Sequence, residues 1–177
     1  EENARKKRYL SLKSELMKKE ILCTAHHQAD QAETFLLQLF RGAGVAGLAS
    51  MPKIKNFSDS FLYRPFLYIS KKDIINYASL NQLEWVEDDS NSNTTFKRNL
   101  LRLDFLPQLE SNFDGVIKNI SRSANHQSEA LRLLHDLAEI DVTEFELIVD
   151  NKIQVMPLLE LPLRRISNVL RYFISLR

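Results

Sequence analysis

The spacing of apolar side chains separates the chain into two regions that differ in their hydrophobic pattern. Up to about residue 110, short apolar runs alternate with amphipathic stretches and polar loops, a pattern typical of α/β folds. Beyond that point apolar residues recur at alternating steps of three and four, the period of a helix with one apolar face. The pattern predicts a buried strand over 21–25 and a hairpin that pairs 145–149 with 153–156. It also predicts helices over 3–19, 30–41, 71–81, 97–106, 117–138 and 164–176.

Glycine, proline and small polar residues mark the predicted loops. Residues 42–61 contain three of the four glycines and predict a loop that covers a neighbouring site. A second loop is predicted over 89–95, after a short extended segment at 84–87. The change in hydrophobic pattern near residue 110 predicts an α/β domain over 1–110 and a small, mostly helical domain over 111–177.

The stretch from Thr24 to Met51, TAHHQADQAETFLLQLFRGAGVAGLASM, carries the densest set of candidate groups. A His-rich turn follows the predicted strand, and the helix after it puts Asp30 and Glu33 within about 60° of each other, roughly one turn apart. In open α/β sheets, ligands bind where strand ends meet helix starts. The two carboxylates are therefore candidate site residues. Apolar side chains on the opposite side of this helix are predicted to face the core: Phe35, Leu36, Leu39 and Phe40.

The two histidines of this stretch allow more than one interpretation. His26 and His27 precede Asp30 and Glu33, and all four side chains are of types that zinc accepts. Adjacent residues at a strand end point in opposite directions, which argues against one ion that holds both histidines. Capping of the following helix by a histidine or by Gln28 is the competing interpretation.

Three arginines are further candidates. Arg41 ends the helix that carries the carboxylates, where it can meet a phosphate or favourably cap the helix C-terminus. Arg98 and Arg102 are four residues apart and so share one face of a predicted helix. Two guanidiniums there suit a bidentate grip on a phosphate or a carbonyl oxygen. Pairing with the acidic residues of 87–89 is the structural alternative.

Composition excludes several classes of protein. With 44% hydrophobic and 27% charged residues and a net charge of +1, the 177-residue chain resembles an ordinary globular protein without a global basic field. No apolar run approaches the roughly 20 residues of a membrane span, and the charged start lacks the apolar centre of a signal peptide. A single cysteine, Cys23, excludes an intramolecular disulfide. The prediction is a cytoplasmic protein with no membrane association.

Four motifs in one order connect the chain to a known family. The stretch AHHQADQAETFLLQLFRGAGVAGL is followed by RPFL at 64–67, WVEDDSN at 85–91 and KRNLLR at 97–102. In this order they resemble the tRNA(Ile)-lysidine synthetases of bacteria, which are N-type ATP pyrophosphatases. Two departures stand out: Ala29 replaces the first of two adjacent aspartates in the family, and the phosphate loop S-G-G-x-D-S is missing. The chain is therefore interpreted as a fragment of such an enzyme.

The resemblance implies a fold, a reaction and a set of site residues. The fold is α/β, a partial nucleotide-binding domain with a parallel sheet, of the adenine nucleotide alpha-hydrolase type, followed by the small helical domain. The enzyme uses ATP to adenylate C2–O of the wobble cytidine in an isoleucine tRNA, and free lysine then displaces AMP. By this resemblance, the catalytic residues are Asp30, Glu33 and Arg98, with Asp30 as a ligand of Mg²⁺, and the substrate-binding residues are His26, Arg41, Asn99 and Arg102.

Two alternatives stay open at this stage. One is a non-enzymatic tRNA-binding fragment, which the missing phosphate loop favours for this chain by itself. The other is a different tRNA-modifying ATP pyrophosphatase, such as the cytidine-thiolating enzymes, although these are expected to have several cysteines and this chain has only Cys23. A homodimer is compatible with either interpretation.

Overall fold

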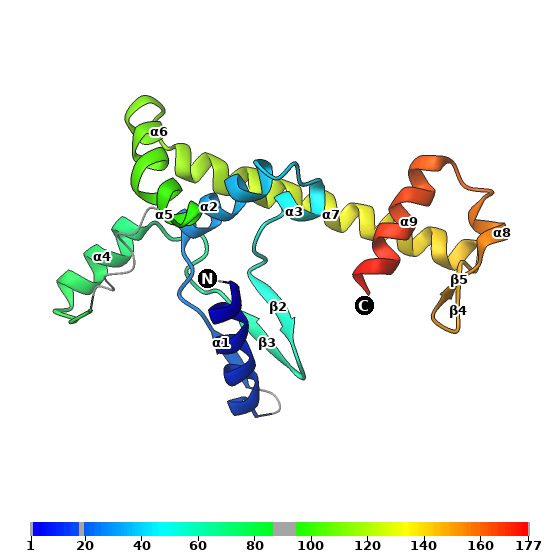
Figure 1. Ribbon diagram of the computed structural model, residues 1–177, viewed down its shortest axis with the longest axis horizontal. Coiled ribbons are helices and arrows are strands. Elements are labelled where there is room, and N and C mark those ends of the chain that lie inside the picture. Colours follow the sequence, from blue (N-terminus) through cyan, green and yellow to red (C-terminus); the bar gives the residue numbers. More distant parts are fainter. Residues whose placement is uncertain (1, 18–19, 87–94, 177) are drawn as a thin grey trace.

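A computed structural model describes residues 2–17, 20–86 and 95–176. One long helix, α7 (Val116–Glu144), crosses the molecule and carries other elements at both of its ends (Figure 1). The N-terminal elements gather around its first half, and the C-terminal elements fold back onto its second half. The elements before α7 are α1 (Glu2–Glu15), β1 (Ile21–Cys23), α2 (Gln28–Leu39), α3 (Val45–Leu48), β2 (Ile54–Phe57), β3 (Ser60–Tyr63), α4 (Lys71–Leu80), α5 (Lys97–Leu100), the π-helical turn η2 (Leu101–Phe105) and α6 (Leu106–Asn112). After it come β4 (Ile148–Val149), β5 (Lys152–Ile153), α8 (Val155–Leu158) and α9 (Leu163–Ser175).

The main sheet is small and mixed. Its strand order is β1-β3-β2, with β1 parallel to β3 and β2 antiparallel to β3. The parallel pair confirms the predicted α/β class, whereas the hairpin of β2 and β3 was not predicted. Strand β1 is shorter than predicted and its outer residues Ile21 and Cys23 are exposed, so the expectation of a buried strand is wrong.

The predicted loop over 42–61 is wrong in its second half. Residues 54–57 and 60–63 form a hairpin whose two-residue turn, Ser58-Asp59, has Ser58 at a φ of 58°. Serine and aspartate in a tight turn gave the stretch the composition of a loop. The first half also contains a short helix, α3, which packs against α7.

The helix predicted to stop near Pro107 continues through it. A proline ring inside an α-helix collides with the carbonyl group four residues earlier and removes one hydrogen bond. Here the chain widens into η2 immediately before the proline, and the N–H of Leu106 bonds to the carbonyl of Leu101. The wider turn lets α5, η2 and α6 follow one another without a loop. The predicted segments at 84–87 and 89–95 lie partly outside the described residues, and 84–86 form no strand.

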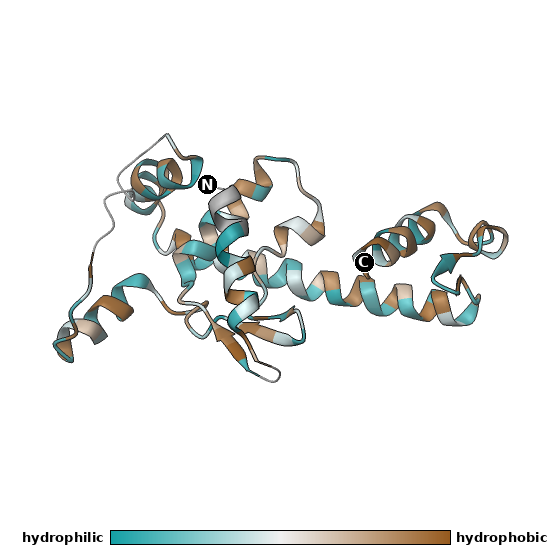
Figure 2. Ribbon diagram, turned by 60° about the horizontal axis from the view of Figure 1, so that its bottom comes forward, coloured by the Kyte–Doolittle hydropathy of each residue, from teal (hydrophilic) through white to brown (hydrophobic). Residues whose placement is uncertain are grey.

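Two hydrophobic clusters form the core, and α7 contributes to both. Near its start, Ile117 and Ile120 pack against a cluster of Leu36, Leu101 and Leu106. Near its end, buried Ala138 belongs to a cluster with Leu147, Leu158, Leu161 and Val169. Figure 2 shows the hydrophobic and hydrophilic turns that alternate along α7, as expected of a helix with one buried face. The division into two domains near residue 110 stays a prediction.

A buried ion pair joins α7 to α9. Asp141 is fully buried, and Arg165 on α9 donates two hydrogen bonds to its carboxylate. Asn168 on the same helix donates to the backbone carbonyl of Leu134 at 2.7 Å. These contacts fix α9 against the end of α7. Within the described residues, no helix combines the length and apolar character needed to cross a bilayer.

Candidate functional site

The start of α2 is anchored by its own side chains. His27 is the N-cap residue, in extended conformation, and its backbone N–H donates to Oδ2 of Asp30 at 2.9 Å. One turn further, the Gln31 side chain exchanges two hydrogen bonds with the backbone of Met51, at 3.0 and 3.1 Å. These bonds satisfy backbone groups that would otherwise lack partners, and they fix the orientation of the helix that carries Asp30 and Glu33.

Two arginines from a distant part of the chain meet these carboxylates. Arg98 on α5 donates from Nε to Oε2 of Glu33 at 2.7 Å and from Nη2 to Oδ1 of Asp30 at 3.3 Å. Arg102 on η2 donates from Nε to Oε1 of Glu33 at 2.7 Å. Its Nη2 donates to Oε2 of Glu33 at 2.9 Å and to Oδ1 of Asp30 at 3.0 Å. The four side chains are named the ionic cluster below.

The ionic cluster is buried, which changes the interpretation of α2. Glu33 is fully buried and Asp30 is 9% exposed, whereas Leu39 and Phe40, predicted to face the core, are 46% and 65% exposed. Two carboxylates and two guanidiniums balance in formal charge, which is the condition under which buried charges are tolerated. The prediction that the carboxylates share one face is confirmed, and the prediction that this face lies away from the core is wrong.

The arginines retain donors that the cluster does not use. Each guanidinium carries five N–H groups, and the bonds described above involve only Nε and Nη2. Within the described residues, Nη1 of Arg98 and of Arg102 has no hydrogen-bond partner. The side chains of these two arginines are 20% and 30% exposed. The carboxylates therefore orient two cations that can still bind an oxygen atom of a ligand.

Burial and charge act on two titratable groups beside the cluster. Burial lowers the pKa of His27 below 6.5, although the carboxylates of Asp30 and Glu33 oppose that shift. The imidazole is therefore neutral at pH 7. Its Nδ1 lies 3.4 Å from Oδ2 of Asp30 and, among the described residues, makes no hydrogen bond. The hydrogen bond to Glu33 raises the pKa of Arg102, which keeps this guanidinium charged.

A cavity of about 370 Å³ opens beside the ionic cluster. Glu33 and Arg102 line one side of it, together with the start of α2 at residues 27–29. The other sides come from the starts of α4 and α7 and from α6. The remaining lining residues are Ser70, Lys71, Lys72, Leu106, Pro107, Glu110, Gly115, Ile117 and Lys118. The cavity is large enough for a phosphate group or a small metabolite.

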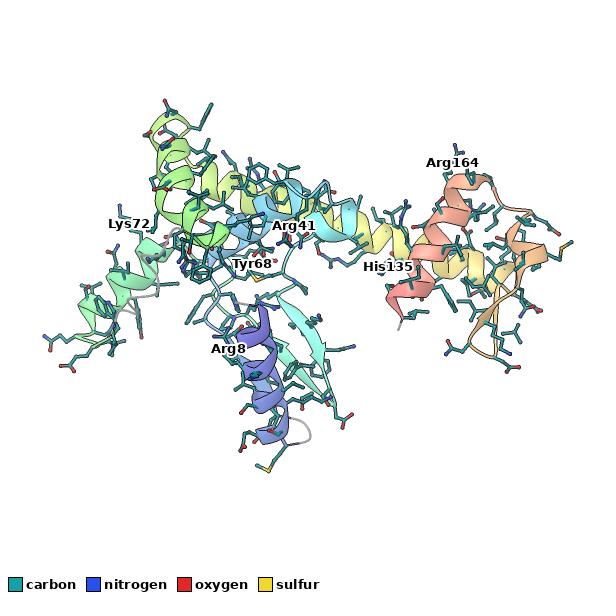
Figure 3. All side chains as sticks on the ribbon, in the orientation of Figure 1. Arg8, Arg41, Tyr68, Lys72, His135 and Arg164 are labelled. Carbon is teal, nitrogen blue, oxygen red and sulfur yellow. The ribbon has the colours of Figure 1, made fainter. Side chains whose placement is uncertain are left out.

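The other predicted site residues lie at varied distances from this centre. His26 is half-buried in the turn before α2, where its Nδ1 is 2.9 Å from the hydroxyl of Thr24. Asn99 follows Arg98 on α5, is half-buried and does not line the cavity. Arg41 is exposed at the opposite end of α2 from Asp30, and Figure 3 shows it beside α3. The structure thus groups Asp30, Glu33, Arg98 and Arg102 but does not bring Arg41 to them.

The surroundings of Asp30 do not suit a magnesium ion. Oδ2 accepts from the backbone of His27, and Oδ1 accepts from both guanidiniums of the ionic cluster. Two positive charges beside a carboxylate oppose the approach of a divalent cation. Across 2–17, 20–86 and 95–176, no group of three histidine, cysteine, aspartate or glutamate side chains could hold a metal. The Mg²⁺ ligand role of Asp30 stays a prediction that this geometry does not favour.

Sequence reasoning missed the lysines of the cavity. Lys71 and Lys72 open α4, and Lys118 lies in the first turn of α7. A helix N-terminus carries a partial positive charge, so cations there are unfavourable for the helix itself. The sequence did contain a signal of an anion site here, because residue 71 was already predicted to begin a helix and lysine is unfavourable at that position.

Comparisons with known proteins agree with the motifs. A family model described as a PP-loop domain matches residues 1–109. The chain is 47% identical over 173 residues to a tRNA(Ile)-lysidine synthase of Coxiella burnetii, which covers 98% of this chain and 38% of the relative. It is 42% identical over 175 residues to the same enzyme of Legionella pneumophila, covering 99% of this chain and 40% of the relative.

A third relative, the tRNA(Ile)-lysidine synthase of Photorhabdus laumondii, is 48% identical over 141 residues, with 80% of this chain and 32% of the relative covered. The chain thus spans at most about 40% of the length of these three relatives. The family model matches more than half of the chain. The resemblance to the tRNA(Ile)-lysidine synthetases is therefore confirmed, and the chain belongs to the PP-loop family.

Proposed function

We propose that this chain is part of an enzyme that uses ATP and free lysine to convert the wobble cytidine of an isoleucine tRNA to lysidine. The observation that carries the proposal is the ionic cluster, in which two separate motifs, AHHQADQAET and KRNLLR, meet beside a cavity. Relatives that carry the name tRNA(Ile)-lysidine synthase match the chain over 98% and 99% of its length, a span that includes both motifs. The comparisons do not favour the non-enzymatic alternative.

The proposed reaction has two balanced steps. First, the C2 oxygen of cytidine attacks the α-phosphorus of ATP, a P–O bond forms, the bond to the β-phosphate breaks and pyrophosphate leaves. Second, the neutral ε-amine of lysine attacks C2, a C–N bond forms, the C–O bond breaks and AMP leaves with the electron pair. Negative charge develops on phosphoryl oxygens in the first step and on the departing AMP in the second. Fixed cations aimed at those oxygens stabilise both transition states.

In this proposal, Arg98 and Arg102 supply the cations. Their unused Nη1 donors bind phosphoryl or cytidine oxygens, because guanidinium groups suit bidentate contact with such groups. Asp30 and Glu33 are positioning residues, since their oxygens already accept hydrogen bonds from the arginines. His26 and Asn99 are predicted substrate contacts at the rim of this region. Arg41 lies too far along α2 to join them without the substrate as a bridge.

His27 is a candidate proton acceptor for the second step. Lysine must lose the proton of its ε-ammonium before its amine can attack, and a base that is neutral at pH 7 can accept that proton. Burial keeps the His27 imidazole neutral, and the residue lines the cavity beside Glu33. Its role is testable through the pH dependence of turnover.

The test is lysidine formation by the full-length protein with ATP, lysine and an isoleucine tRNA transcript. Arg98→Lys keeps one charge but removes the fork of donors, so kcat should fall by about 10²-fold or more. Arg132→Lys is the matched control at an exposed arginine of α7 that neither belongs to the cluster nor lines the cavity, and it should retain most of the activity. Equal activity of both variants would contradict the assignment of Arg98.

A further inference from the structure

Three helix N-termini converge on the cavity beside the ionic cluster. The starts of α2, α4 and α7 all contribute lining residues, and these helices are 12, 10 and 29 residues long. A helix N-terminus carries a partial positive charge. At α2 the Asp30 carboxylate accepts a backbone N–H, and at α4 the Ser70 hydroxyl does so, which leaves the N-terminus of α7 as the most open of the three. Figure 1 shows α4 approaching the region where α2, α5 and α6 meet the start of α7.

Three ammonium groups add to this positive field. Lys71, Lys72 and Lys118 line the cavity, and in the described ranges none of them forms an ion pair or hydrogen bond. Figure 3 shows Lys72 at the end of α4 that lies nearest α6. Among the described lining residues two are acidic, and Glu33 is neutralised within the ionic cluster, which leaves Glu110. The lining therefore holds an excess of positive charge.

The N-cap residue of α7 is a glycine and so cannot cap the helix with a side chain. This residue is Gly115, at a φ of 68°, and no side chain within the described residues supplies the cap hydrogen bond. A Cβ atom built on Gly115 would meet nothing within 4 Å, so the approach to the first turn is open. The N–H of Val116 already donates to the carbonyl of Phe113 at 3.2 Å, so the N–H groups that remain for an acceptor are those of Ile117 and Lys118, which line the cavity.

We propose that this cavity binds a phosphate group, held by Lys71, Lys72 and Lys118 together with the first turn of α7. Lysines in the first turn of a helix oppose the helix dipole, and a bound anion removes that conflict by neutralising both. A phosphate supplies several acceptor oxygens and a full negative charge, which matches ammonium groups and N–H groups that converge.

The phosphate has two potential sources, a phosphodiester of bound RNA and the phosphate chain of a nucleotide. The RNA source rests on the proposed function, whereas binding of pyrophosphate can be measured whatever reaction the protein catalyses. Failure of the phosphate site and failure of the proposed function can therefore be told apart. A protein that forms no lysidine but binds pyrophosphate through these lysines refutes only the proposed function.

The test compares two double variants of the full-length protein. Lys71→Ala with Lys118→Ala removes two charges from the cavity. Lys55→Ala with Lys152→Ala removes two charges from exposed positions that do not line it. All four lysines are exposed, so both variants should fold, and thermal melting checks this. Affinity is measured for pyrophosphate by calorimetry and for an isoleucine tRNA transcript by fluorescence anisotropy at several salt concentrations.

Each outcome decides the proposal. If an RNA phosphate occupies the cavity, the slope of log affinity against log salt falls by about 0.7 to 0.9 in the cavity variant and not in the control. If a nucleotide phosphate occupies it, pyrophosphate affinity falls about tenfold or more in the cavity variant alone, with the RNA slope equal to that of the control. If neither ligand distinguishes the two variants, or if the unsubstituted protein binds neither, the proposal is overturned.

Discussion

The substitution Glu33→Ala tests the ionic cluster through stability. Removing one partner of a buried ion pair costs about 3 to 5 kcal/mol when the remaining charge has no compensation. Here Asp30 still faces Arg98 and Arg102, whose side chains are 20% and 30% exposed, so the expected loss is about 2 to 3 kcal/mol. For a chain of this size, about 1 kcal/mol corresponds to roughly 2 to 4 °C in the melting temperature. The variant should therefore melt about 4 to 12 °C lower.

Differential scanning calorimetry measures this difference, with two variants for comparison. Glu33→Gln keeps the volume and one acceptor oxygen, so its melting temperature should fall less than that of Glu33→Ala. Glu110→Ala removes an exposed glutamate from the same cavity and should change the free energy of unfolding by no more than about 0.5 kcal/mol. A Glu33→Ala protein that melts within a degree of the unsubstituted protein would refute the argument that the cluster is buried and mutually compensated.

Further predictions concern three other positions and the chain by itself. Leu147→Ala, at a fully buried position, should lower the free energy of unfolding by about 2 to 5 kcal/mol in a denaturant titration. Gly115→Ala should cost about 1 to 2 kcal/mol in the same assay, because its φ of 68° strains any side chain while the space around it is open. Burial lowers the pKa of His27 in the folded state, so the unfolded state binds the proton more tightly. The free energy of unfolding should therefore decline as the pH falls below about 6.5. In thermal melts between pH 7 and pH 5, His27→Gln should flatten that decline. The 177-residue chain alone should release no pyrophosphate above background with ATP, lysine and tRNA, because a PP-loop enzyme needs its phosphate loop.

Local patterns predicted the helices well. The capping pair Ser70 and Asp73 marks the start of α4, where the hydroxyl of Ser70 accepts from the N–H of Asp73 at 3.1 Å. The step of three and four residues located both ends of α9 within one residue and the start of α7 within one residue, whereas α7 continues six residues beyond the predicted end at 138. Such signals lie within one or two turns of the chain, so a sequence displays them directly.

Long-range partners were outside the reach of the same reasoning. Glu33 bonds to Arg98 and Arg102, which are 65 and 69 residues away in the sequence. The periodicity of α2 does not indicate such partners. Without them, two carboxylates on a helix indicate a face exposed to solvent. With them, the charges cancel and that face becomes part of the interior. The hairpin of β2 and β3 was missed for a related reason, since the composition of a tight turn resembles that of a long loop.

The most direct test of the central claim is a tRNA-dependent assay of the full-length protein. The account predicts that ATP and free lysine together convert the wobble cytidine of an isoleucine tRNA to lysidine, detected by mass spectrometry of the digested RNA, with one pyrophosphate released for each lysidine formed. Arg98→Lys should suppress both products together, while Arg132→Lys should not. Absence of lysidine with the unsubstituted, folded protein, or full activity of Arg98→Lys, would contradict the account.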